Sequence, residues 1–149
     1  MKKKGNGRFL LVAIGIVIVL VAGACISGTQ KSGLEIKNFQ IEPTEIHPEG
    51  AINVKFDVVN HDKQIISKNS FDVHLYLVEP PDCEKYWDWQ KTKTIDKELG
   101  FESSYPVLFT VQSKDTIPSG GAIYTFKACC GPNATNKCIV CSEDTVTVT

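Results

Sequence analysis

Residues 52–58 restrict the fold of this chain more than any other segment. Apolar and polar side chains alternate strictly along it: one parity holds Ile52, Val54, Phe56 and Val58, and the other holds Asn53, Lys55 and Asp57. Successive side chains of a β-strand point to opposite faces of its sheet. The segment therefore predicts a strand with one face buried and the other in water.

The same period of two recurs along the chain. It returns at residues 71–77, 107–111, 124–128 and 145–149. In residues 34–41 the apolar parity changes between Ile36 and Phe39, which indicates either a β-bulge or a strand that passes between two sheets. No segment after residue 34 has a helical apolar stripe. We predict an all-β, immunoglobulin-like β-sandwich of six or seven antiparallel strands, preceded by an N-terminal hydrophobic signal or anchor helix.

Three of these segments together carry a family resemblance. They read Phe39-x-Ile41-x-Pro43-x-x-Ile46, Gly50-x-Ile52-x-Val54-x-Phe56-x-Val58-x-Asn60 and Phe71-x-Val73-x-Leu75-x-Leu77. The pattern resembles the CARDB modules, immunoglobulin-like domains of prokaryotic and often archaeal surface proteins. It covers residues 34–78 and, more loosely, 105–149. The resemblance implies a non-catalytic role in adhesion, spacing or partner binding, and it brings no catalytic residues to this chain.

An apolar run at residues 9–24 determines where the rest of the chain is expected to lie. Lys2, Lys3, Lys4 and Arg8 precede it, and Cys25 follows it. Basic residues stay in the cytoplasm, so the chain after the run is expected to be exported. Sixteen residues at about 1.5 Å each span about 24 Å, less than the roughly 30 Å of a bilayer core, which favours a signal peptide.

The end of this run leaves three outcomes open. Ala22-Gly-Ala24 before Cys25 resembles a lipobox, with Cys25 as the lipid attachment site, although Ala22 stands where Leu or Val is usual. The same residues fit signal-peptide cleavage and secretion. Without cleavage, the segment is a membrane anchor with a cytoplasmic N-terminus. Each outcome gives residues 1–25 as signal or anchor, 26–33 as a flexible tether and 34–149 as an extracytoplasmic domain.

The charge of the chain excludes some partners. Four of the sixteen Lys and Arg residues precede the apolar run, so the remaining chain holds twelve against all seventeen acidic residues, a net charge of −5. A nucleic-acid partner requires clustered Lys and Arg, and so does an anionic lipid surface. We therefore expect no nucleic-acid partner and no docking on anionic headgroups.

Five cysteines lie in the expected exported domain: Cys83, Cys129, Cys130, Cys138 and Cys141. Disulfides persist in an oxidising compartment, so we expect one bridge that closes the hairpin at 129–141 and one from Cys83 to that cluster. Zinc or iron–sulfur ligation and a redox-active C-x-x-C are the alternatives. Adjacent cysteines on a strand point to opposite faces, so Cys129 and Cys130 do not readily share an ion. We expect no metal and no cofactor.

Residues 79–104 interrupt the alternation and form an expected insertion. It contains Tyr86, Trp87 and Trp89. These aromatic residues either bind a sugar or protein partner or fold back to cover one end of the sandwich. In the hairpin at 129–141, Asn133-Ala-Thr135 is an acceptor sequon for N-glycosylation, with Asn133 as its site.

The motifs of common catalytic sites are missing from the sequence. It has no G-x-S-x-G, no H-E-x-x-H and no phosphate-binding glycine loop, so we expect no enzyme. The predicted function is a membrane- or lipid-anchored surface module for adhesion, spacing or binding of an extracellular protein or glycan. Two alternatives stay open: a single-pass accessory subunit of a membrane complex, and an extracellular thiol or metal-binding protein that uses the Cys-rich hairpin.

Overall fold

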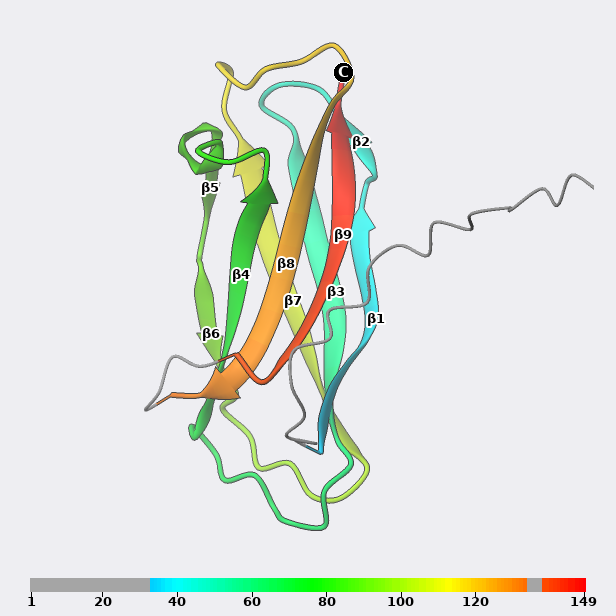
Figure 1. The fold of residues 1–149 in the computed structure, drawn as a ribbon, viewed down its shortest axis with the longest axis vertical. Coiled ribbons are helices and arrows are strands. Elements are labelled where there is room, and N and C mark those ends of the chain that lie inside the picture. The colour runs from blue at the N-terminus through cyan, green and yellow to red at the C-terminus, as the bar shows by residue number, and fades with distance from the viewer. Residues whose placement is uncertain (1–32, 134–137) are drawn as a thin grey trace, which may run out of the picture.

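The computed structural model describes residues 33–133 and 138–149, and these form two packed β-sheets (Figure 1). The first sheet has the order β1 (Leu34–Glu42), β3 (Ala51–Asn60), β7 (Ser103–Ser113) and β5 (Trp87–Trp89). The second has the order β2 (Glu45–Ile46), β9 (Val140–Val148), β8 (Ala122–Pro132), β4 (Phe71–Glu79) and β6 (Thr92–Thr94). Neighbouring strands are antiparallel, except that β2 runs parallel to β9.

The prediction of an all-β, immunoglobulin-like sandwich is confirmed. The six long strands β1, β3, β4, β7, β8 and β9 are the six that alternation predicted. The predicted N-terminal helix, Cys25 and the apolar run lie outside the described residues. No helix within residues 33–133 and 138–149 has the length and apolarity needed to cross a membrane.

The change of parity in β1 has a local cause. The pairing of β1 with β3 shifts register between Lys37 and Gln40, and Asn38 between them has a positive φ of 54°. The predicted bulge is thus confirmed, because the extra residue turns Ile41 to the same interior side as Leu34. Two residues beyond β1, the chain joins the second sheet as β2, so the first segment of the domain belongs to both sheets.

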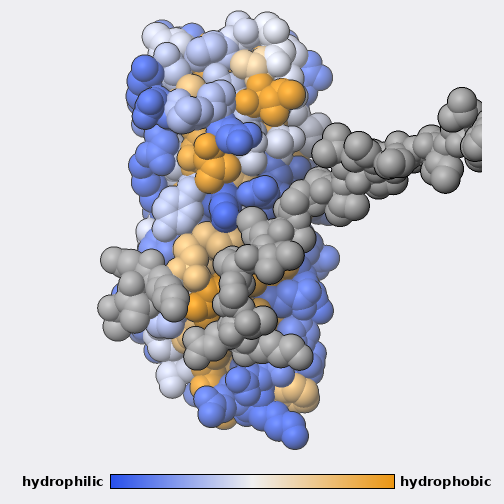
Figure 2. All heavy atoms as spheres, in the orientation of Figure 1, coloured by the Kyte–Doolittle hydropathy of each residue, from blue (hydrophilic) through white to orange (hydrophobic). Residues whose placement is uncertain are grey.

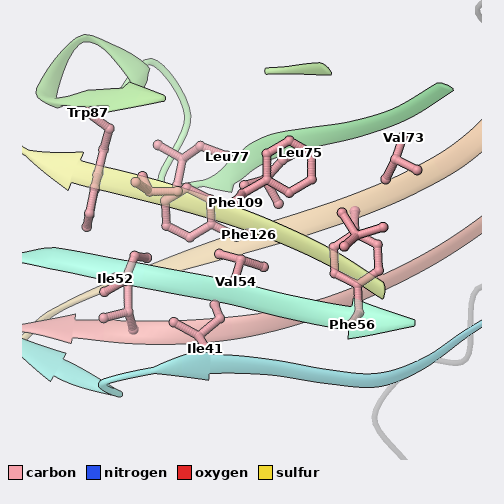
Figure 3. Close-up of a cluster of buried hydrophobic side chains, with 14 of the residues drawn as sticks. Ile41, Ile52, Val54, Phe56, Val73, Leu75, Leu77, Trp87, Phe109 and Phe126 are labelled. Atoms are coloured by element: carbon pink, nitrogen blue, oxygen red, sulfur yellow. The ribbon is translucent and has the colours of Figure 1, made fainter. Parts of the chain in front are cut away.

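The core lies between the sheets and is built from the predicted apolar parities (Figure 3). Ile52, Val54 and Phe56 of β3 lie in the same buried cluster as Val73 and Leu75 of β4. The remaining fully buried large side chains are Phe109 and Val111 of β7, Tyr124 and Phe126 of β8, and Ile41, Val58, Ile95 and Leu99. Because each long strand has one apolar face, the two sheets bury their inner-face side chains against each other and leave their outer faces to solvent.

Residues 79–104 contribute more to the sandwich than the sequence indicated. They form a 3₁₀ turn, η1 (Glu84–Tyr86), and then the edge strands β5 and β6, one in each sheet. Ile95 and Leu99 of this segment are buried in the core. The segment therefore crosses from one sheet to the other; its strands of three residues are too short to give a clear alternation in the sequence.

One buried polar side chain joins the loops at the end of the sandwich where β3 finishes. Asn60 is 0% exposed. Its side-chain amide donates to the carbonyl oxygens of Gln64 at 2.9 Å, Leu99 at 3.1 Å and Gly100 at 3.3 Å. Its Oδ1 accepts from the backbone N–H of Asp62 at 2.9 Å. Asn60 thus takes the place of backbone hydrogen bonds between the loop after β3 and the loop before β7.

His61, the next residue, lies between two carboxylates. Its Nε2 is 2.7 Å from Glu35 and its Nδ1 is 3.0 Å from Glu102. These hydrogen bonds, with Glu102 first, raise the pKa of His61 above its ordinary value of 6.5. The hydrogen bond from His61, followed by that from Lys37, lowers the pKa of Glu35.

This arrangement predicts a pH-dependent stability. A raised histidine pKa stabilises the fold fully below the ordinary pKa, and the contribution is lost as pH rises through the raised value. The contribution of Glu35 is also stabilising, but it depends on pH in the opposite way and is lost only in acid, as pH falls through the lowered pKa of Glu35. We expect the melting temperature to fall as pH rises above 6.5. H61Q should flatten this part of the profile, and an unchanged slope in H61Q would contradict the assignment.

Candidate functional site

Three cysteines gather on the outer face of the five-stranded sheet. The register of β8 and β9 sets Cys129 directly opposite Cys141, and Cys138 comes two residues before β9. The sulfur atoms of the three residues lie within 4.8 Å of one another. We call Cys129, Cys138 and Cys141 the thiol cluster. Cys129 is buried, Cys138 is half-buried and Cys141 is exposed, so the cluster opens to solvent on the Cys141 side.

Cys130 belongs to the opposite side of the same strand. It is fully buried in the hydrophobic core, and burial raises the pKa of its thiol to about 12. The prediction that Cys129 and Cys130 point to opposite faces is confirmed. The cluster therefore takes one of the two adjacent cysteines of β8, and Cys130 is an apolar core residue.

The hairpin geometry explains why the C-x-x-C reaches Cys129. The backbone N–H of Ile139 donates to the carbonyl oxygen of Cys130 at 2.9 Å, which fixes the start of β9 against the end of β8. Val140 then pairs with Cys130, and Cys141 with Cys129. The chain bends at Ile139, just before the ladder begins, and the sulfur of Cys138 lies with those of Cys129 and Cys141.

Hydrogen bonding within the cluster separates the acidities of its thiols. The hydrogen bond with Cys129 is the main cause that lowers the pKa of Cys141, and the charge of Lys127 acts in the same direction. The hydrogen bond with Cys141, followed by burial, raises the pKa of Cys129. Of the two, the exposed thiol of Cys141 is thus the more acidic, and the thiolate is the form that attacks disulfides and binds metals.

Two aromatic residues of β4 border the cluster. His74 pairs with Cys129 across the sheet, and its Nδ1 lies 2.9 Å from the hydroxyl of Thr92. The ring of His74 stacks on that of Tyr76, with 6.0 Å between the centroids. Burial, and after it the nearby sulfurs, raises the pKa of Tyr76. The register thus places Cys141, Cys129 and His74 side by side across β9, β8 and β4, with Tyr76 next to His74 on β4.

The rest of this face is mixed in character. Tyr76, Val78 and Ile123 are exposed on β4 and β8. Figure 2 shows hydrophobic groups separated by hydrophilic ones over the part of this face that is not covered by grey atoms. Scattered apolar residues of this kind are usual on protein surfaces and do not by themselves mark an interface.

The structure separates Cys83 from the thiol cluster. Cys83 lies just before η1, beyond the end of β4 where Glu79 pairs with Thr125. Cys130 pairs with Val73 near the other end of β4. Six strand residues at about 3.3 Å each put about 20 Å between the two ends. A disulfide needs Cα atoms within about 7 Å, so the expected bridge from Cys83 to the hairpin is wrong for this fold.

Two roles were predicted for the aromatic residues of the insertion: binding a partner and covering the end of the sandwich. The structure favours the second role. Trp87 is 3% exposed, and its ring meets those of Tyr124 and Phe126 edge-on, at 5.3 and 5.2 Å between centroids. The prediction that Trp87 contacts a partner is therefore wrong in this conformation. Trp89 and Tyr86 are half-buried against the core, and the indole of Trp89 donates to the carbonyl oxygen of Leu75 at 3.1 Å. A partner contact by Trp89 or Tyr86 stays a prediction.

Asn133, the predicted glycosylation site, is tied to a neighbouring loop. Its amide nitrogen donates to the carbonyl oxygen of Asn69 at 2.6 Å, and its backbone N–H donates to Ser70 at 3.1 Å. Residues 134 and 135 of the sequon lie outside the described residues. A glycan would replace one of the two hydrogens on the Asn133 amide nitrogen and leave the other for the hydrogen bond to Asn69. Its modification stays a prediction.

Among the described residues, the thiol cluster is the one group of three or more cysteine, histidine or acidic side chains that each offer one ligand atom with all of these atoms within 4.8 Å of one another. The sequence indicated the hairpin but not the composition of the cluster. The pairing of Cys129 with Cys141 depends on the register between β8 and β9, which neither strand's sequence reveals alone. The only sequence signal for the cluster was the C-x-x-C spacing of Cys138 and Cys141. The expected disulfide partners Cys129, Cys138 and Cys141 do lie together, and their oxidation state stays a prediction.

Fold and site define the class of this protein as an immunoglobulin-like β-sandwich module that carries a cysteine cluster on one outer face. No protein-family model matches the sequence, and a search of the curated proteins gives no match either. The fold is similar to that of a CARDB domain from Pyrococcus furiosus, with a TM-score of 0.50 and 16% identity over 78% of this chain and 92% of that one.

Two further solved structures have a similar fold. A FixG-related protein from Vibrio parahaemolyticus gives a TM-score of 0.51 with 10% identity, over 78% of this chain and 97% of that one. The sporulation control protein Spo0M from Bacillus subtilis gives 0.50 with 11% identity, over 78% of this chain and 49% of that one. At these identities the likeness concerns the fold alone. The resemblance to CARDB modules is confirmed at that level.

Proposed function

We propose that this chain is a non-catalytic, membrane-anchored module that stands outside the cytoplasm and spaces or binds a partner there. The observation that carries the proposal is the order of leader, tether and sandwich along the chain. The sandwich begins at Leu34, directly after the tether at 26–33, and the basic and apolar leader precedes both. A leader of this kind directs the downstream domain across the membrane, and a two-sheet sandwich is a stable unit that needs no cofactor.

The position of the termini supports an anchored spacer. The domain begins at one end of its long axis, and the C-terminus lies at the other (Figure 1). The thiol cluster is near the end where the domain begins, because Cys130 pairs with Val73 while Glu79 pairs with Thr125 at the opposite end. An anchor before residue 34 would therefore attach at the end of the domain that carries the thiol cluster, opposite the loop that contains Cys83.

Labelling of intact cells with a membrane-impermeant amine reagent tests the proposal. Lys63 and Lys68 are exposed on the loop after β3, so peptides that contain them should be labelled before the cells are lysed. Lys2, Lys3 and Lys4 serve as internal controls, since they should be absent from the mature chain or labelled only after lysis. Labelling of Lys63 and Lys68 only after lysis would place the domain in the cytoplasm and contradict the proposal.

Mass analysis of the mature N-terminus separates the forms of anchoring. A diacylglyceryl group on Cys25 indicates a lipid-anchored module. An intact Met1 in the membrane fraction supports the second candidate, a single-pass accessory subunit whose apolar segment packs against other helices. A soluble mature chain that begins at Cys25 contradicts anchoring and leaves a secreted module.

A further inference from the structure

We propose that Cys129, Cys138 and Cys141 bind one zinc ion on the outer face of the five-stranded sheet. This inference departs from the disulfides and the absence of metal that the sequence led us to expect. It concerns residues that the spacing or binding role does not use, and it holds whether or not the chain is anchored.

The positions of the sulfur atoms fit a single ion. Zinc–thiolate bonds are about 2.3 Å long, so two sulfurs on a tetrahedral ion are about 3.8 Å apart. The three sulfurs of the thiol cluster already lie within 4.8 Å of one another. Small side-chain rotations are enough to bring them to bonding distance, because Cys141 is exposed and Cys138 is half-buried.

The number of thiols favours an ion over a disulfide. A bridge between Cys129 and Cys141 is geometrically possible, since directly opposed residues of antiparallel strands have Cα atoms about 4.5–5.5 Å apart. It would leave the thiol of Cys138 against the bridge, where thiol–disulfide exchange can reopen it. One ion uses all three sulfurs. The spacing Cys138-Ile-Val-Cys141 is also the C-x-x-C of structural zinc sites, here completed by a cysteine from the partner strand.

The chemistry of the cluster selects a soft cation. Its three ligand atoms are all sulfur, whereas calcium and magnesium require oxygen ligands. Cysteine thiols must lose their protons to bind a metal, so zinc binding releases protons. Three protein ligands leave one tetrahedral position to solvent or to an added ligand, on the side where Cys141 is exposed.

Calorimetric titration of the reduced full-length chain in detergent with Zn²⁺ tests the proposal. We expect one ion per chain, bound with release of protons. C141S and C138S should weaken binding by more than the 10–100-fold that loss of an outer-sphere partner typically costs. C83S is the matched control, because Cys83 is half-buried at the opposite end of the domain, and it should bind as the wild type does. Circular dichroism of each variant verifies that the sandwich is retained.

Three results would overturn the proposal. The first is no binding by a folded, reduced chain. The second is binding that C141S leaves unchanged or that C83S weakens equally, which would place the ion elsewhere. The third is peptide mapping of the protein isolated from cells without reductant that finds two of Cys129, Cys138 and Cys141 joined as a disulfide. Copurified zinc at one ion per chain, with all three thiols reduced, supports it.

Discussion

W87A is expected to lower the free energy of unfolding by about 3–5 kcal/mol, the range for loss of a fully buried large aromatic side chain. The indole of Trp87 lies between β5 and the core, edge-on to Tyr124 and Phe126. Alanine leaves a cavity that the two packed sheets cannot close. In thermal unfolding the midpoint should fall by about 10 °C or more for a domain of this size.

Two further variants show whether packing is the cause. The indole N–H of Trp87 is buried and has no hydrogen-bond partner in the described part of the chain. W87F keeps a ring in the site and removes that unpaired donor, so it should lose much less stability than W87A. W89A removes a half-buried ring and should also cost less. A W87A protein with wild-type stability that fails to bind a partner would show that Trp87 is a contact residue after all.

N60A is expected to cost about 2–3 kcal/mol, although it removes only a small side chain from a loop junction. Its loss leaves three carbonyl oxygens and one backbone N–H without the amide that satisfies them. A buried polar group without a partner costs about 1–3 kcal/mol. Chemical denaturation should show a lower midpoint with an unchanged slope, because N60A and the wild type expose the same amount of surface when they unfold.

Asn53 on the same strand provides the matched control. Its Oδ1 accepts a hydrogen bond from the hydroxyl of Thr110 at 3.1 Å on the exposed outer face of β3. Water can replace that bond, so N53A should change stability by no more than about 0.5 kcal/mol. If N60A and N53A lower stability equally, the buried hydrogen bonds of Asn60 are worth no more than an exposed one, which contradicts the prediction.

The sequence predicted the long strands well because each of them has one buried face. Ile52, Val54 and Phe56 alternate with polar residues, because a strand with one face on the core and one in water needs apolar side chains on the first and polar side chains on the second. The short edge strands β5 and β6 were missed because three residues carry almost no periodic signal. Their place is set by pairing with β7 and β4, which are distant in the sequence.

The candidate site shows the same division between local and distant information. The opposite orientation of Cys129 and Cys130 follows from strand geometry and was predicted correctly. The convergence of Cys129 with Cys138 and Cys141 depends on the register of β8 with β9. The wrong expectation for Cys83 arose because the path of the chain from β4 to η1, away from the hairpin, cannot be read from cysteine spacing.

The continuous segment β1–β2 lies at the edge of both sheets, and it is also the part of the domain nearest the tether. If the proposed anchor holds the domain, a pull between it and the end of β9 would act along β1, parallel to its length. The backbone bonds between β1 and β3 lie across that direction. These hydrogen bonds would therefore be loaded all at once in shear and would not break one after another. The parallel pairing of β2 with β9 connects the same segment to the second sheet. Such a pull would load the edge strands of both sheets in shear.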